Sequence, residues 1–282
     1  MIKNNLLKSF EFRLDEEIKN VKTVTGGCIN NTYLLLTESK KYFLKLNSSN
    51  LSNLFKTEKL GLELLSSTKT IRIPKVILQE EDPEQYLLIE FIDSNPESIN
   101  YWADFGKRLA QLHKNTSLSF GLDYDNYIGS LHQSNKQHNN WIDFFISERI
   151  KPQLKLATKN SFELNNYFEP LYKELKNILP NEKPALLHGD LWSGNQMPDE
   201  KGRPCIYDPA VYYGNREVDL AMTTLFGKFP NEFYISYNNE YPLIQGWKDR
   251  LDIHNLYPLL VHLNLFGSSY LGQIKQILKR YQ

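Results

Sequence analysis

A run of polar residues in the C-terminal half of the chain has the types and spacing that phosphoryl transfer requires. Asp190 follows the apolar stretch 185–187, Asn195 comes five residues later, and Asp208 ends a second short apolar stretch. A carboxylate can accept the proton of an attacking hydroxyl, while an amide and a second carboxylate offer hard oxygen ligands to Mg²⁺ on nucleotide phosphates. The pattern predicts a phosphotransferase that uses ATP and Mg²⁺, with Asp190 as catalytic base and Asn195 and Asp208 as metal ligands.

Two further residues near this run are expected to support it rather than to react. His188 precedes Asp190 and should form hydrogen bonds beneath the loop. Asp219 lies among apolar residues of an expected helix, so it should be buried and accept backbone N–H groups of the same loop. An acid favoured by the helix dipole is a compatible interpretation of Asp219. A zinc site of His188, Asp190 and Asp208 is a poor alternative, because no second histidine lies at ligand spacing.

The first third of the chain carries the residues expected to bind a nucleotide. A glycine turn at 26–30 lies between two predicted strands, Lys45 interrupts an apolar strand, and Glu58 lies on the following helix. Alone, these are a plain turn, a lysine at a strand edge and a solvated carboxylate. Their order along the chain favours the phosphate loop and the lysine–glutamate pair of a kinase. The residues predicted to bind the cofactor are Gly26, Gly27, Cys28, Asn30, Lys45, Glu58, Glu90 and Ile92.

Periodicity divides the chain into a part rich in strands and a helical part. Strands are expected near 21–25, 32–36, 42–46, 75–78 and 86–92, with a helix at 51–66. Helices are expected at 101–114, 140–157, 162–178, 217–227, 231–239 and 256–281. The fold class is therefore α+β with two lobes. Residues 1–93 should form a small antiparallel-sheet lobe with one helix, and residues 94–282 a larger, mainly helical lobe that carries catalysis and the substrate.

Composition narrows the classes of partner. Lys plus Arg and Asp plus Glu both number 33 in 282 residues, and this balance argues against a nucleic-acid-binding protein. The apolar windows are too short to span a bilayer, and the N-terminus lacks the apolar segment of a signal peptide. Two cysteines, Cys28 and Cys205, do not make a disulfide framework. We expect a cytoplasmic protein that binds neither nucleic acid nor membrane.

Several segments together resemble the fructosamine-3-kinase (ketosamine-3-kinase) family, whose fold is protein-kinase-like. The resemblance extends over nearly the whole chain from about residue 10. The segments that carry it are 26–30, 120–130, 141–154, 208–222 and 256–267. It implies transfer of the ATP γ-phosphate to the 3-hydroxyl of a ketosamine, such as a fructosamine or ribulosamine, free or on a protein lysine. Phosphate at C3 is a good leaving group on the carbon next to the C2 carbonyl, so its elimination followed by hydrolysis would free the amine and repair the glycated molecule.

The resemblance also suggests roles for individual residues. Trp192 is similar to a residue that lines the sugar site, although a core tryptophan is the alternative. Arg216 and Glu217 are expected to border the acceptor pocket. Cys28 matches a loop cysteine associated with redox sensitivity and disulfide-linked dimers, and an inert small residue is the alternative. The chain is thus expected to be a monomer or a redox-linked homodimer.

Other functions fit the same residues less well. Another small-molecule kinase of this fold, acting on an aminoglycoside, choline or a homoserine-like alcohol, is the main alternative. A protein kinase fits poorly, because the short span between Asp208 and Asp219 leaves no room for a long activation segment. A binding module without catalysis is disfavoured, because the chain has every polar residue that the predicted phosphoryl transfer requires.

Overall fold

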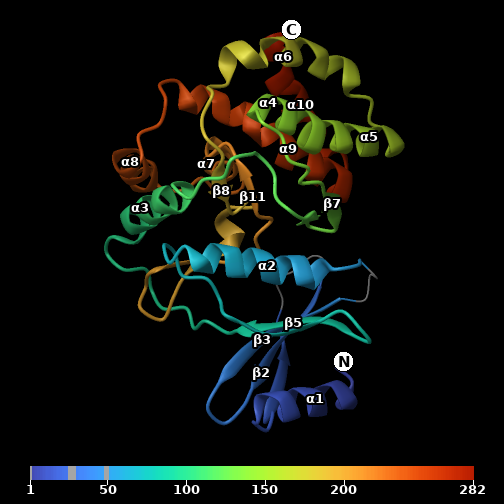
Figure 1. Cartoon of the computed structure of the whole chain (residues 1–282), viewed down its shortest axis with the longest axis vertical. Coiled ribbons are helices and arrows are strands. Elements are labelled where there is room, and N and C mark those ends of the chain that lie inside the picture. The colour runs from blue at the N-terminus through green and yellow to red at the C-terminus, as the bar shows by residue number, and fades with distance from the viewer. Residues whose placement is uncertain (1, 25–29, 48–50) are drawn as a thin grey trace.

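A five-stranded antiparallel sheet forms the N-terminal lobe of the computed structural model, which describes residues 2–24, 30–47 and 51–282 (Figure 1). The elements of this lobe are α1 (Asn4–Leu14), β1 (Asn20–Thr23), β2 (Asn31–Leu36), β3 (Lys41–Asn47), α2 (Leu54–Ser67), β4 (Val76–Glu80) and β5 (Gln85–Glu90). In space the strands lie in the order β1-β2-β3-β5-β4, and each pair of neighbours is antiparallel.

The two faces of the sheet pack against different helices. Along β3, Tyr42 and Leu44 face α1, where they pack with Phe10. Phe43 and Lys45 alternate with them and face α2. Strand periodicity therefore places Lys45 on the same side of the sheet as Phe43, toward the second lobe.

The N-terminal lobe contains one helix more than expected. The sequence predicted α2 alone, yet α1 covers the outer face of the sheet, opposite α2 (Figure 1). Leu6, Leu7, Phe10 and Leu14 recur at helical spacing and supply its buried side. This pattern was present in the sequence, although it is short and lies at the terminus.

The second lobe is mainly helical, with six short strands that form three antiparallel pairs in the described part of the chain. Its elements are α3 (Tyr101–His113), β6 (Asn126–Ile128), β7 (Leu131–Gln133), α4 (Trp141–Phe144), a π-helical turn (Phe145–Ile150), α5 (Lys151–Lys159), α6 (Asn165–Ile178), β8 (Ala185–Leu187), β9 (Gln196–Pro198), β10 (Pro204–Ile206), β11 (Tyr212–Gly214), α7 (Glu217–Met222), α8 (Asn231–Glu240), α9 (Trp247–Phe266) and α10 (Leu271–Leu278).

Some helix boundaries differ from those expected. The expected helix 140–157 is divided into α4, the π-helical turn and α5, and Pro152 lies in the first turn of α5. The expected helix 256–281 is divided into α9 and α10 at Gly267, whose φ is +94°. The expected helix 217–227 ends at Met222.

The helix α2 belongs to the cores of both lobes. Its Phe55 and Leu62 share a buried cluster with Leu109 of α3 and with Ile206 and Val211. Figure 1 shows α2 between the sheet and the helical lobe. Because α2 also carries Glu58, packing between the lobes fixes the position of a predicted site residue. No helix in the described part of the chain is long and apolar enough to cross a bilayer.

Candidate active site

The loop after β8 is held in place by one buried carboxylate. Asp219 of α7 accepts hydrogen bonds from the backbone N–H groups of His188, at 2.7 Å, and Gly189, at 2.9 Å. Gly189 has φ +83°, and a Cβ there would lie 2.0 Å from the carbonyl oxygen of Ala210. Only glycine fits both constraints. The contact predicted for Asp219 is therefore present.

His188 has the structural environment that the sequence predicted. Its Nε2 donates to the carbonyl oxygen of Tyr207 at 3.0 Å, and its Nδ1 accepts from the backbone N–H of Asp190 at 3.3 Å. Burial lowers the pKa of His188 and outweighs the opposing effect of Asp219. The ring is neutral with both nitrogens engaged, so it supports the loop.

Asp190 and Asn195 are in direct contact. The amide nitrogen of Asn195 donates to both the backbone carbonyl and the carboxylate Oδ2 of Asp190, each at 2.9 Å. Burial raises the pKa of Asp190 to about 7; the Asn195 hydrogen bond opposes this effect, and the charges of Asp208 and Asp219 add to it. Such a carboxylate can take and release a proton near neutral pH.

Lys45 connects the two lobes through a buried ion-pair cluster. Its ammonium lies 2.6 Å from Glu58 of α2 and 2.5 Å from Asp208. The Lys45 side chain is 6% exposed, whereas that of Asp208 is 44% exposed. Burial alone would lower the pKa of Lys45, but the carboxylates of Asp208 and Glu58 outweigh it and raise the pKa, so the lysine is charged. The predicted pairing of Lys45 with Glu58 is present.

Two cavities meet at these residues. The larger, of about 490 Å³, is bounded on one side by β5 and the segment after it, including Glu90 and Ile92. The smaller, of about 280 Å³, is bounded by Asp190, the β6–β7 hairpin and the end of α9. Residues common to both cavities are Asn30, Lys45, Trp192, Asn195 and Asp208. Asp190 lines only the smaller cavity, so the predicted base faces one of the two cavities and not the other.

Comparison with known proteins identifies the family. The fructosamine kinase family model matches residues 4–282. The chain belongs to the fructosamine kinase family.

Individual family members resemble the chain over most of its length. It is 41% identical over 275 residues to the "Probable ketoamine kinase" of Synechocystis sp., with 95% of this chain and 91% of that protein covered. It is 38% identical over 274 residues to "Protein-ribulosamine 3-kinase, chloroplastic" of Arabidopsis thaliana, with 94% of this chain and 83% of that protein covered. A crystal structure of a candidate fructosamine-3-kinase from Thermobifida fusca matches with a TM-score of 0.89 and 30% identity, covering 99% of this chain and 98% of that one. The predicted family and the bilobal kinase-like fold are confirmed.

The oxygen atoms in this fructosamine kinase site are suited to Mg²⁺. Asp208 presents an exposed carboxylate, and the Asn195 amide uses its nitrogen on Asp190, which leaves its oxygen as a potential ligand. Within the described ranges, no three His, Cys, Asp or Glu side chains gather into a metal site. Two protein oxygens completed by phosphates and water are typical of Mg²⁺ at a nucleotide.

The remaining predicted nucleotide residues are only partly described. Glu90 and Ile92 line the larger cavity, but the Glu90 carboxylate already pairs with Arg72 and accepts the N–H of Lys75 at 3.1 Å. Asn30 lines both cavities. The predictions for Gly26, Gly27 and Cys28 lie outside the described residues.

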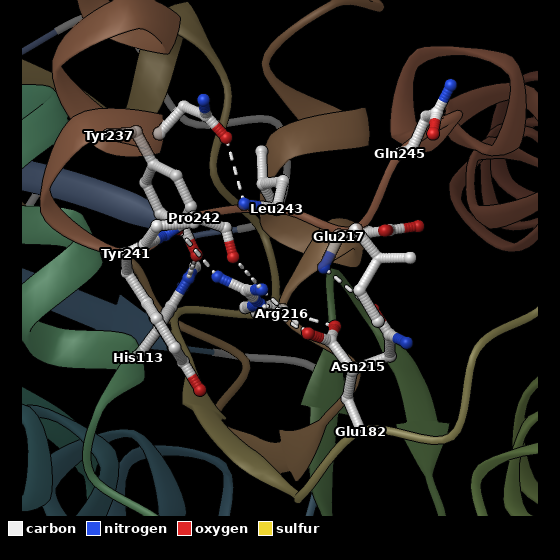
Figure 2. A network of polar contacts seen from close by, with 12 residues as sticks. His113, Glu182, Asn215, Arg216, Glu217, Tyr237, Tyr241, Pro242, Leu243 and Gln245 are labelled. Carbon is white, nitrogen blue, oxygen red and sulfur yellow. Dashed lines mark hydrogen bonds and ion pairs between the residues drawn. The ribbon is translucent and has the colours of Figure 1, made fainter.

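Arg216 does not border the acceptor cavity, contrary to the expectation from the resemblance. It is 3% exposed, and its guanidinium pairs with Glu182 at 2.6 Å (Figure 2). It also donates to the carbonyl oxygens of Tyr241, at 2.8 Å, and Pro242, at 2.7 Å. Arg216 lines neither cavity of the cleft, because its charge is used inside the helical lobe to fix the loop after α8.

Glu217 is likewise buried away from the cleft, which corrects the same prediction. It is 0% exposed and lies 2.5 Å from Arg250, with His254 at 3.4 Å. Burial alone would raise the pKa of Glu217, but the hydrogen bonds from Arg250 and the nearby His254 outweigh it and hold the pKa below its ordinary value. Both residues therefore stabilise the base of α7, the helix that carries Asp219.

Trp192 lies at the junction of the cavities, next to aromatic residues that sequence reasoning missed. Its ring meets Phe226 edge to face at 5.8 Å, and Phe226 lies 4.6 Å from the ring of His262. His262 and Phe266 line the smaller cavity at the end of α9. The spacing of these aromatic residues along the chain did not indicate that they would lie beside Trp192. Segment 256–267 was noted only for its family resemblance.

Proposed function

We propose that this chain transfers the γ-phosphate of ATP, bound with Mg²⁺, to the 3-hydroxyl of a ketosamine. Family membership supports the substrate class. The observation that carries the proposal is the meeting of two cavities at Lys45, Asn195 and Asp208, with Asp190 on the smaller side only. ATP would occupy the larger cavity and the sugar the smaller one. Residues 1–93 would then supply most nucleotide contacts, and residues 94–282 the base and the acceptor contacts.

Each charged residue has a defined part in this reaction. Lys45, fixed by Glu58, would bind the α- and β-phosphates. Asn195 and Asp208 would hold Mg²⁺, which when bound neutralises charge on the phosphates. Asp190 would accept the proton of the 3-hydroxyl, held in place by the Asn195 amide.

The bonds made and broken then balance. The sugar O3 forms a bond to the γ-phosphorus, while the bond from that phosphorus to the bridging β-oxygen breaks and ADP leaves. The hydroxyl proton ends on Asp190. Trp192 would lie against the C–H face of the sugar, since an indole offers the flat apolar surface that sugars bind. Later elimination of the C3 phosphate, followed by hydrolysis of the imine that it leaves, would release the amine.

An acceptor panel tests this proposal. ADP release would be measured with ATP, Mg²⁺ and either a ribulosamine, a fructosamine, a glycated protein, an aminoglycoside, choline or homoserine. We expect turnover only with the ketosamines and the glycated protein. Faster turnover with any of the other alcohols would assign the chain a different acceptor.

The redox-linked homodimer and the cytoplasmic location remain proposals beside this function. The dimer depends on Cys28, and Cys205 is a buried free thiol that cannot substitute for it. Non-reducing electrophoresis of the wild type and Cys28→Ser would show an oxidant-dependent dimer in the wild type alone. A wild type that stays monomeric after oxidation would remove the proposal.

A further inference from the structure

Asp208 has a backbone conformation that surrounding contacts must maintain. Its φ is +57°, in the left-handed region that is disfavoured for residues with a Cβ. Pro209 follows directly, and the carboxylate reaches Lys45 at the junction of the cavities. The contacts that hold residues 207–211 therefore decide where this predicted metal ligand lies.

One set of contacts joins this segment to the catalytic loop. The N–H of Tyr207 donates to the carbonyl oxygen of Asn195 at 3.1 Å, and the N–H of Ala210 donates to that of His188 at 2.9 Å. These bonds use the N–H groups on either side of Asp208. The carbonyl oxygens of Ala210 and Val211 accept hydrogen bonds from a different element.

The second set comes from the β6–β7 hairpin. The amide nitrogen of Asn126 donates to the carbonyl oxygen of Val211 at 2.8 Å. The amide nitrogen of Gln133 donates to that of Ala210 at 3.1 Å. Asn126 is 4% and Gln133 is 1% exposed, so water does not compete for these bonds.

The two amides cannot rotate freely, because their oxygens are also engaged. Gln133 Nε2 donates to Asn126 Oδ1 at 2.7 Å, and Gln133 Oε1 accepts from the hydroxyl of Tyr257 at 2.7 Å. Asn135 Nδ2 donates to Asn126 Oδ1 at 3.1 Å and is itself bound, through Oδ1, by Arg149 at 2.6 Å. Each amide has its donor and acceptor groups fixed, as a rigid support requires.

The hairpin also faces the acceptor cavity and the first lobe. Asn126 and Gly129 line the smaller cavity, and the Tyr127 hydroxyl donates to the carbonyl oxygen of Ser52 at 2.9 Å. The Val211 side chain packs against Gly61 of α2, where an added Cβ would come within 3.1 Å. The same short element thus contacts the acceptor cavity, the Asp208 segment and the other lobe.

We propose that Asn126 and Gln133 are positioning residues that hold the Asp208 carboxylate in its metal-binding orientation. The inference rests on the proposed function, since it takes Asp208 as a ligand of nucleotide-bound Mg²⁺. The hairpin acts through the carbonyl oxygens of Ala210 and Val211 and touches neither metal nor nucleotide. Loss of these hydrogen bonds would weaken the contribution of Mg²⁺ to nucleotide binding while leaving metal-free nucleotide binding intact.

Calorimetric titration of the whole protein with ADP, with and without Mg²⁺, tests this without any acceptor sugar. Gln133→Met keeps the size of the side chain and removes both of its polar groups. We expect the gain in ADP affinity from Mg²⁺ to fall about fivefold, as the loss of one or two buried hydrogen bonds would produce. The affinity for ADP without Mg²⁺ should stay within about twofold of the wild type, because Lys45 is not touched.

Gln153→Met is a matched control. Gln153 is also a buried glutamine, 4% exposed, whose oxygen accepts from Asn264 at 2.9 Å in a part of the helical lobe away from Asp208. Even if Gln153→Met is less stable than the wild type, it should keep the full gain in ADP affinity from Mg²⁺. If Gln133→Met does not fold, Tyr257→Phe removes only the hydroxyl that orients Gln133 and should reduce the Mg²⁺ effect about twofold.

The outcomes separate this inference from the proposed function. The positioning role would be overturned if the Mg²⁺ effect on ADP affinity were unchanged in Gln133→Met, or in Tyr257→Phe where Gln133→Met does not fold. An equal reduction of this effect in Gln153→Met would overturn it as well. A wild type that gains nothing from Mg²⁺ would overturn the metal assignment itself, and the inference with it.

Discussion

The amide nitrogen of Asn195 lies 2.9 Å from both the backbone carbonyl oxygen and the carboxylate of Asp190. One side chain therefore fixes the predicted base at two points. It also directs its own oxygen away from Asp190, where a cation bound by Asp208 could use it. The roles of base and metal site are coupled through this one residue.

Asp190→Asn should slow turnover while leaving nucleotide binding nearly unchanged. The substitution keeps the size of the side chain but removes the proton acceptor, and such bases are worth about 10²–10⁴ in rate. Asp190 lines only the smaller cavity, so ADP affinity should stay close to that of the wild type. Steady-state kinetics and ADP titration would check both. Activity within about threefold of the wild type would exclude the base role.

Asp208→Ala should weaken nucleotide binding in the presence of Mg²⁺, unlike Asp190→Asn. The variant removes the exposed carboxylate and should abolish most of the Mg²⁺-dependent gain in ADP affinity, about tenfold or more. Binding without Mg²⁺ should persist, because Lys45 keeps its contact with Glu58. Titration of ADP at several Mg²⁺ concentrations would measure this. An unaltered Mg²⁺ dependence would show that another residue holds the metal.

Glu182→Gln should reduce stability and not acceptor recognition. It leaves the buried guanidinium of Arg216 without its carboxylate, which costs about 3 kcal/mol when a buried pair is broken. Glu84→Gln is a control at an exposed pair with Lys3 and should cost less than about 1 kcal/mol. Urea unfolding would give both values, and KM for the ketosamine should not change. A selective rise in that KM would restore Arg216 to the acceptor site.

Glu217 should make stability fall in acid. Its pKa in the folded chain lies below its ordinary value of 4.5, so the unfolded chain binds this proton more readily. The stabilisation is fully present above the unfolded pKa and is lost as pH falls through the folded one. Glu217→Gln should therefore be less stable than the wild type at neutral pH, and the difference should narrow below about pH 5. A difference in unfolding free energy that is constant with pH would contradict the shift.

The sequence was most informative where contacts are local or follow from strand alternation. Asp190, Asn195 and Asp208 are brought together by one strand, a loop and a tight hairpin, so their spacing alone indicated a site. Lys45 could be placed because alternate residues of a strand share a face, and the next helix supplied Glu58.

Contacts between distant segments were not predictable in the same way. Arg216 and Glu217 were assigned to the acceptor pocket, but the partners that bury them, Glu182 and Arg250, lie 34 and 33 residues away. The bond from Asn126 to Val211 spans 85 residues. Nothing in the local pattern of a polar residue tells whether its charge will meet a substrate or a distant side chain.

The most direct measurement of the central claim is the position of the phosphate in the product. Wild-type protein would be incubated with ATP, Mg²⁺ and a ribulosamine, and the product examined by proton–phosphorus correlation NMR, with Asp190→Asn alongside. We expect a phosphate bonded to O3 in the wild-type reaction and almost none with the variant. Phosphate on a different hydroxyl, or equal product from both proteins, would contradict the account.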